Sequence, residues 1–263
     1  MRVDIWSDIV CPFCYLGKRN FEIALTQFEH RDAVEVRWHS FELDQNARED
    51  NALPLAERIA AKYSLNLEES IATQEGIAER AQEVGLDFNW RNAKYGNSFD
   101  AHRIIHHATA QGKAAEAQEA FKKAYFTQGC SIEKHESIRK IASDIGLDSR
   151  QVDEILAGDQ YAEDVRADER VAQELGITSV PFFLIEAQWV INGAQPSAAI
   201  LAGLNRVWTE THKPQTMPPV RPHVPQNPEV QGGGRKEHPE YLIRHGCTDG
   251  DQANNAISKH VHL

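Results

Sequence analysis

Two cysteines three positions apart, Cys11 and Cys14, constrain the fold of this chain more than any other feature. Residues 3–6 just before them form a strand-like segment, and residues 15–28 just after them have the apolar spacing of an amphipathic helix. The pair is therefore predicted at a helix N-terminus, where unpaired backbone N–H groups and the positive end of the helix dipole favour a thiolate. A thiolate placed there can attack a disulfide, and the second thiol can release the product.

A C-x-x-C pair also occurs as half of a zinc site or as two unrelated core thiols. The chain contains no second C-x-x-C or C-x-x-H motif that would complete a tetrahedral zinc site. The strand-to-helix context favours redox chemistry, so we predict no metal site and no cofactor. The two residues between the cysteines, Pro12 and Phe13, are expected to tune the reduction potential.

The composition of the chain narrows its class. Its 263 residues include 28 basic and 39 acidic side chains, a formal charge of −11 that argues against nucleic acid or an anionic membrane as the main partner. No apolar run approaches the roughly 18 residues of a membrane span. The N-terminus has no signal-peptide pattern, so we expect a cytoplasmic protein. In the cytoplasm, four cysteines indicate redox or catalytic roles rather than a disulfide scaffold.

Strand patterns occur near both ends of the globular sequence. Residues 34–43 alternate apolar and polar side chains, so strand, helix and strand within the first 43 residues predict a βαβ unit with parallel strands. Residues 182–185 and 189–191 are predicted as a hairpin around a three-residue loop, followed by a helix at residues 198–207. Between these halves the apolar spacing is helical, with helices expected at residues 99–109, 113–127, 136–145, 149–157 and 159–175.

These patterns predict an α/β, thioredoxin-like fold: a central mixed β-sheet flanked by helices, with a large all-helical insertion and an extended C-terminal tail. We assign residues 1–48 and 175–210 to the thioredoxin-like domain and residues 49–174 to the inserted helical domain. Residues 211–263 form a Pro-, Gly- and His-rich extension, whose proline density opposes helix and central strand.

The second half of the site is predicted in residues 176–181, the loop before the returning hairpin, which lies beside the cysteine pair in a thioredoxin-like fold. Pro181 has no N–H, so it cannot donate a hydrogen bond to a nearby thiolate. We expect a cis Val180–Pro181 bond, which exposes the preceding backbone to an extended substrate peptide. The alternative is an ordinary trans proline that opens an edge strand.

Three segments together resemble the DsbA family: residues 8–17 around the cysteines, the loop at residues 176–183 and residues 97–103. More narrowly, they resemble its FrnE-like branch, which includes relatives of 2-hydroxychromene-2-carboxylate isomerases. The resemblance covers roughly residues 1–210. It implies a thioredoxin core with a helical insertion, a cis-proline loop and thiol–disulfide oxidoreductase or disulfide isomerase activity.

By this resemblance, Cys11 is an exposed nucleophile, Cys14 is the resolving thiol and Pro181 is the cis residue. The isomerase and kappa-class glutathione transferase relatives typically carry serine at the Cys11 position, so the presence of both cysteines favours redox function. The expected partners are protein disulfides or dithiols, together with a thiol redox partner or glutathione. The oligomeric state stays open.

Supporting residues have two interpretations each. Asp8 either caps the strand-to-helix turn or relays a proton. His102, in the segment that resembles the family, either stabilises the thiolate as a nearby cation or is a buried histidine bonded to backbone. Cys130 and Cys247 either pair with each other, or Cys247 exchanges with the central pair as an accessory redox thiol, or both are free.

Two rival functions remain. One is a glutathione-dependent isomerase or transferase that acts on aromatic small molecules and keeps its activity without Cys14. The other is a chaperone-like or metal-binding module in which the C-x-x-C pair is structural. Neither rival has a sequence signature as strong as a strand, a C-x-x-C pair and a helix combined with a Val-Pro loop.

Overall fold

The computed structural model describes residues 1–48 and 53–212. Within these residues one mixed sheet has the strand order β2-β1-β3-β4. The two outer pairs match the predicted halves: β1 is parallel to β2 through a helical crossover, and β3 and β4 form an antiparallel hairpin that joins β1 in antiparallel register. The predicted thioredoxin-like mixed sheet is confirmed. Its strands are β1 (Arg2–Ser7), β2 (Glu35–Ser40), β3 (Phe182–Ile185) and β4 (Trp189–Asn192).

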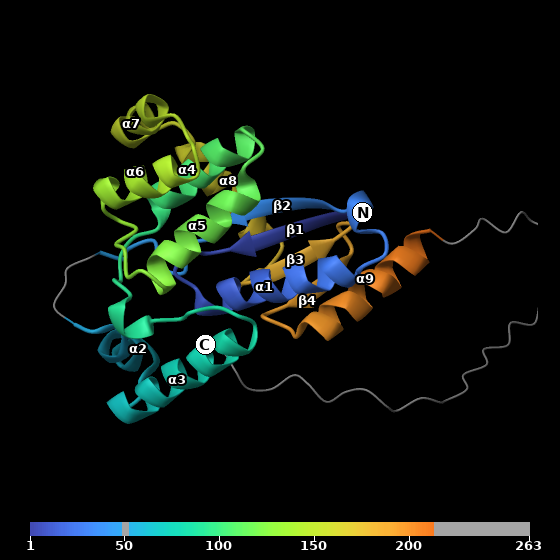
Figure 1. The fold of residues 1–263 in the computed structure, drawn as a ribbon, viewed down its shortest axis with the longest axis horizontal. Helices are drawn as coiled ribbons and strands as arrows, with labels where there is room; N and C mark the ends of the chain where they lie inside the picture. The colour runs from blue at the N-terminus through green and yellow to red at the C-terminus, as the bar shows by residue number, and fades with distance from the viewer. Residues whose placement is uncertain (49–52, 213–263) are drawn as a thin grey trace, which may run out of the picture. The chain divides into compact units, whose positions relative to one another are not determined.

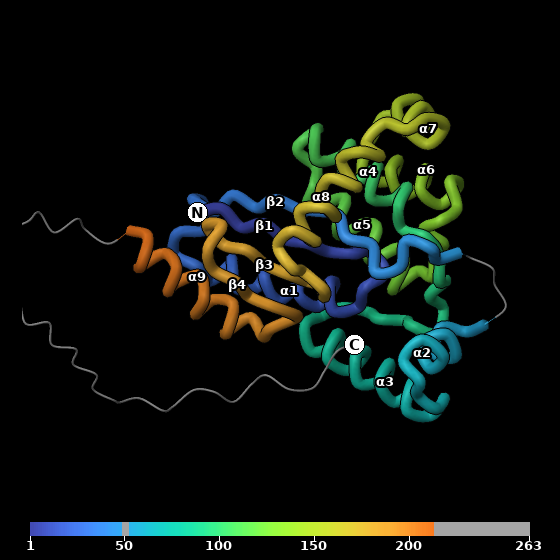
Figure 2. The backbone as a smooth tube through the Cα atoms, turned by 180° about the vertical axis from the view of Figure 1, so that it is seen from behind, coloured from blue at the N-terminus to red at the C-terminus, as the bar shows by residue number. Residues whose placement is uncertain are grey.

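Helices cover both faces of the sheet. On one face α1 (Pro12–Gln27) and α9 (Ser197–Thr211) lie side by side, as Figure 1 shows. Val3 and Ile5 of β1 pack into the core beneath them, whereas Trp6 packs with Ala172 of α8 (Ala162–Glu174). Because successive strand side chains point to opposite faces, α8 covers the other face, which is the nearer one in Figure 2.

The predicted all-helical insertion between β2 and β3 is confirmed. Its core contains Ile104, Phe121 and Ile138, and Tyr15 from α1 joins the same cluster. The segment therefore packs against the helix that carries the cysteine pair. In chain order, the remaining helices are α2 (Leu55–Tyr63), α3 (Leu67–Glu83), α4 (Phe99–Ala110), α5 (Ala114–Phe126), α6 (His135–Asp144) and α7 (Ser149–Ala157), and the short 3-10 turns are η1 (Arg31–Ala33) and η2 (Trp90–Asn92).

The predicted domain limits stay a proposal. Helix α8 belongs by position to the assigned insertion at residues 49–174, yet it packs along β2. Helix α9 runs to Thr211, slightly past the predicted end of the closing helix. The rest of the predicted C-terminal extension, with Cys247, lies outside the described residues. No helix in the described part of the chain is long and apolar enough to cross a membrane.

Candidate active site

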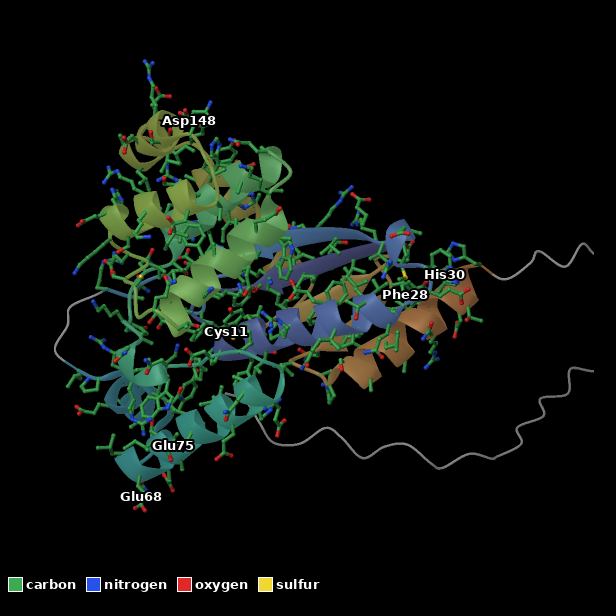
Figure 3. All side chains as sticks on the ribbon, in the orientation of Figure 1. Cys11, Phe28, His30, Glu68, Glu75 and Asp148 are labelled. Carbon is green, nitrogen blue, oxygen red and sulfur yellow. The ribbon has the colours of Figure 1, made fainter. Side chains whose placement is uncertain are left out.

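The cysteine pair lies at the start of α1, as predicted. Cys11 is the residue that caps this helix, and Cys14 is in its first turn, where its backbone N–H donates to the Cys11 carbonyl oxygen at 3.1 Å. Pro12 occupies the first helical position, which needs no N–H donor. Figure 3 shows Cys11 at the N-terminal end of α1. Both thiols are free.

Both thiols are buried, with exposed fractions of 3% for Cys11 and 1% for Cys14. The predicted exposure of Cys11 is therefore wrong for this structure. The physical reason is apolar packing: Trp6, Ile177 and Val180 enclose the two sulfurs, with Phe13 packed against the same cluster. A substrate disulfide can reach Cys11 only when some of this cover moves.

The Val180–Pro181 loop lies directly against the pair. Its peptide bond is cis, and the Cys11 thiol donates a hydrogen bond to the Val180 carbonyl oxygen at 3.5 Å. Pro181 also packs tightly on α1, because a Cβ atom added at Gly17 would lie 2.7 Å from the proline Cγ. The absence of a side chain at Gly17 thus lets the loop approach the helix that carries both cysteines.

The two thiols hold their charge unequally. Burial, with the hydrogen bond to Cys14 and its charge, raises the pKa of Cys11 well above its ordinary value. Burial acts in the same direction on Cys14, but the hydrogen bond from Cys11 and the positive charge of Lys122 outweigh it and lower the pKa of Cys14. The first negative charge of the reduced pair therefore rests on Cys14. Before Cys11 can attack as a thiolate, its proton must leave.

Asp8 and His102 form a buried pair beneath this turn. The Asp8 carboxylate accepts the Leu43 backbone N–H at 2.8 Å and lies 3.3 Å from His102 Nε2. Burial opposes ionisation, but His102 and the Leu43 N–H outweigh it and lower the pKa of Asp8. Asp8 does not cap α1; within the turn it makes only a long 3.4 Å contact with the Val10 N–H.

The histidine matches neither sequence interpretation as stated. His102 is almost fully buried on α4 and faces Asp8 rather than a backbone group or a thiolate. Its Nδ1 atom has no hydrogen-bond partner among the described residues. The predicted position of His102 beside the site is nevertheless met, because it reaches the residue three positions before Cys11.

Sequence reasoning missed one charged residue of the site. Lys122 of α5 is completely buried, and its charge acts on Cys14. The available signal was its position between apolar neighbours, Phe121 and the pair Ala124 and Tyr125, in a helix whose buried face it shares. A lysine there is ordinarily interpreted as a solvent-exposed side chain.

The other predicted thiol is not part of this cluster. Cys130 is half-buried in the loop after α5, packs against the core of the helical insertion and has its Sγ 3.9 Å from Gln128 Oε1. It is a free cysteine. Among residues 1–48 and 53–212, no group of His, Cys, Asp and Glu is arranged to hold a metal ion.

A cavity of about 510 Å³ opens beside the pair. Phe41 and Ile177 line it and also belong to the cluster around the thiols. Its outer part is charged: Arg166 donates to Glu42 and Glu169, both at 2.6 Å. The arrangement provides an apolar wall next to the sulfurs and a polar rim farther out.

A free dithiol in the first turn of a helix, a mixed sheet and a cis X–Pro loop against the first sulfur define a protein of the thioredoxin-fold dithiol class. The model of the DsbA-like thioredoxin domain matches residues 2–204, so the chain belongs to the DsbA family.

Known relatives agree with this assignment. The chain is 38% identical to a probable DsbA oxidoreductase, SCO1869, from Streptomyces coelicolor, with a TM-score of 0.77 over 88% of this chain and 100% of that structure. It is 29% identical to the uncharacterized protein YwbO of Bacillus subtilis, over 74% of this chain and 90% of the relative.

More distant structures share the fold alone. A 2-hydroxychromene-2-carboxylate isomerase is 16% identical, with a TM-score of 0.59 over 80% of this chain and 98% of that one. The cytosolic disulfide reductase DsbM of Pseudomonas aeruginosa, crystallised with GSH, is 15% identical, with a TM-score of 0.56 over 79% and 99% of the two chains.

Proposed function

We propose that this protein catalyses thiol–disulfide exchange on protein substrates, with Cys11 and Cys14 as its redox pair. The observation that carries the proposal is the placement of two free thiols in the first turn of α1, with the Cys11 sulfur 3.5 Å from the carbonyl oxygen of Val180. Membership of the DsbA family supports it. The cytoplasmic location and the FrnE-like branch remain predictions.

The exchange follows from the chemistry of the pair. The Cys11 thiolate attacks one sulfur of a substrate disulfide, forms a mixed disulfide and expels the other substrate sulfur as a thiolate. The Cys14 thiolate then attacks the Cys11 sulfur, which closes the Cys11–Cys14 disulfide and releases the second substrate thiolate. Two electrons pass from the protein to the substrate, and the reverse sequence oxidises a substrate dithiol.

The Val180 carbonyl offers a way to start this reaction. It accepts the hydrogen bond of the Cys11 thiol in the resting protein. A substrate peptide that binds as an added strand beside Pro181 presents a backbone N–H to the same carbonyl. Competition for this acceptor frees the Cys11 thiol and allows its proton to leave.

Supporting roles follow from position. Pro12 and Phe13 surround the sulfurs and tune the potential, and Phe13 lies 5.8 Å from the Arg80 guanidinium of α3. Asp8, held ionised by His102, places a negative charge below the pair. The cavity beside Phe41 is a suitable place for a substrate side chain or for glutathione, the ligand named in the DsbM structure.

The test is an equilibrium titration of the Cys11–Cys14 pair against glutathione, measured by thiol alkylation and mass spectrometry. A reversible two-thiol transition in the family range of roughly −270 to −120 mV is expected. Cys11→Ser should abolish exchange, Cys14→Ser should accumulate mixed disulfides, and Cys130→Ser should leave exchange unchanged as the matched control. Full disulfide exchange in Cys11→Ser contradicts the proposal.

The rival functions give different results in the same preparation. A glutathione-dependent isomerase or transferase, the activity class of one fold neighbour, keeps its turnover of aromatic substrates in Cys14→Ser. A structural C-x-x-C module keeps its client binding when both cysteines are replaced, and it releases metal when denatured. Either result, together with thiols that never form a bond, overturns the redox assignment.

A further inference from the structure

Lys122 is a buried cation without a carboxylate partner. Its side chain is fully buried, and its Nζ donates to the neutral Gln118 amide oxygen at 2.7 Å. Within the described residues no carboxylate oxygen lies within 4.0 Å of this ammonium group. Lysine is rarely buried unless its charge is compensated, so the surroundings of Lys122 need to supply a negative charge.

The packing of α5 against α1 shows where Lys122 lies. Glu119 of α5 accepts hydrogen bonds from Tyr15 at 2.8 Å and from Lys18 at 2.5 Å, and Phe126 stacks on Tyr15 with ring centroids 5.9 Å apart. Lys122 falls between Glu119 and Phe126 on the same helix face, three residues after one and four before the other. It therefore faces the first turn of α1, which contains Cys14.

The charges around Lys122 are known from this packing. Burial lowers its pKa to about 8, while the negative charges of Cys14 and Asp8, and more weakly Cys11, act in the opposite direction. Lys18 is the positive group that faces it and lowers its pKa further. Of the two strongest negative neighbours, Cys14 contributes more than Asp8.

Only one of these charges depends on the redox state. Asp8 stays paired with His102 at 3.3 Å whether the thiols are reduced or oxidised, and Lys18 stays ion-paired with Glu22 and Glu119. Disulfide formation removes the charge of Cys14 because a disulfide sulfur is neutral. The buried ammonium of Lys122 then loses its main counter-ion.

We propose that Lys122 is the counter-ion of the Cys14 thiolate and that it releases its proton when the dithiol is oxidised. This inference rests on the proposed redox function of the pair. The reduced state holds one thiol, one thiolate and one ammonium; the oxidised state holds a disulfide and a neutral amine. Two electrons pass to a substrate disulfide or to glutathione disulfide, and two protons leave, one from the Cys11 thiol and one from Lys122.

The test compares three proteins: wild type, Lys122→Met and Lys123→Met. Lys123 is the exposed neighbour on the same helix, so its replacement is the matched control. The equilibrium constant of the Cys11–Cys14 disulfide against glutathione is measured from about pH 6 to about pH 9. Below about pH 8, oxidation of wild type and Lys123→Met should become more favourable by up to one additional factor of ten per pH unit, or 29.6 mV, relative to Lys122→Met.

Equal pH slopes in wild type and Lys122→Met overturn the proposal while leaving the redox function intact. Thiols that never titrate overturn the redox function itself, so the two failures are distinguishable. If Lys122→Met does not fold, the wild-type protein provides a second test. With carbon-13 in the lysine ε position, one resonance should titrate at about pH 8 in the reduced protein and at lower pH in the oxidised protein. Identical lysine titrations in both states refute the inference.

Discussion

The contact between Gly17 and Pro181 joins the helix of the thiols to the cis-proline loop, and it predicts the effect of Gly17→Ala. The added Cβ would lie 2.7 Å from Pro181 Cγ, 3.4 Å from Pro181 Cβ and 3.6 Å from Phe183 Cζ. Carbon atoms in contact are ordinarily about 3.5 to 4.0 Å apart. The proline ring therefore has to move by roughly 1 Å, and with it the loop that accepts the Cys11 hydrogen bond.

Two effects of opposite sign set the magnitude. In a helix interior, alanine is more favourable than glycine by about 0.5 to 1 kcal/mol. Forcing a methyl group into a packed contact costs about 1 to 3 kcal/mol. Gly76, inside α3, isolates the first effect, because a Cβ added there meets nothing within 4 Å. We expect Gly76→Ala to stabilise the protein, and Gly17→Ala to be less stable than Gly76→Ala by about 1 to 3 kcal/mol.

Urea unfolding of the reduced proteins measures both free energies. Iodoacetamide labelling of Cys11, followed by mass spectrometry, measures the second consequence. Displacement of the loop should uncover Cys11 and increase its alkylation rate in Gly17→Ala but not in Gly76→Ala. Equal stability of the two variants, with unchanged alkylation, would falsify the claim that the close approach at Gly17 positions the loop.

Two further predictions concern a buried charge cluster between the sheet and α8. The ring of His39 lies 2.7 Å from Asp168 and 2.9 Å from Asp4. Burial opposes ionisation of Asp168, but hydrogen bonds from His106 and His39 lower its pKa to about 2, so the cluster contributes about 2 kcal/mol above pH 4 that is lost as the pH falls towards 2. Asp168→Asn should remove this acid-dependent part in urea unfolding. Burial also opposes protonation of His39, but Asp168 and Asp4 outweigh it and raise the pKa of His39. Its contribution is present below pH about 6.5 and lost as the pH rises through the raised pKa, so His39→Gln should be most destabilising at acidic pH.

Local patterns were sufficient to predict the parts of the site that lie on one element. The strand before the cysteines and the helix after them follow from periodicity within about 25 residues, and they place Cys11 at a helix N-terminus. The hairpin after Pro181 has the predicted three-residue loop, in which Glu186 and Ala187 both adopt positive φ. These features depend on neighbours in the chain, which the sequence displays directly.

Features that depend on contacts between distant elements could not be predicted. The burial of Cys11 comes from Ile177 and Val180, which lie more than 160 residues away. The role of α8 on the sheet depends on Asp168, whose carboxylate bonds His39 and the Ser40 N–H across 128 to 129 residues. Helical periodicity shows that such a helix has an apolar face, but it does not show which surface that face covers.

The helical insertion therefore takes part in the chemistry of the site. The thioredoxin-like part of the chain provides both sulfurs and the cis-proline loop. The insertion provides His102 from α4, which holds Asp8 ionised, and Lys122 from α5, whose charge favours the Cys14 thiolate. A charge near a buried thiolate acts on the reduced state alone, because the disulfide is neutral. Substitutions in the insertion should therefore change the potential of the pair and its dependence on pH, whereas substitutions at the sulfurs should abolish exchange.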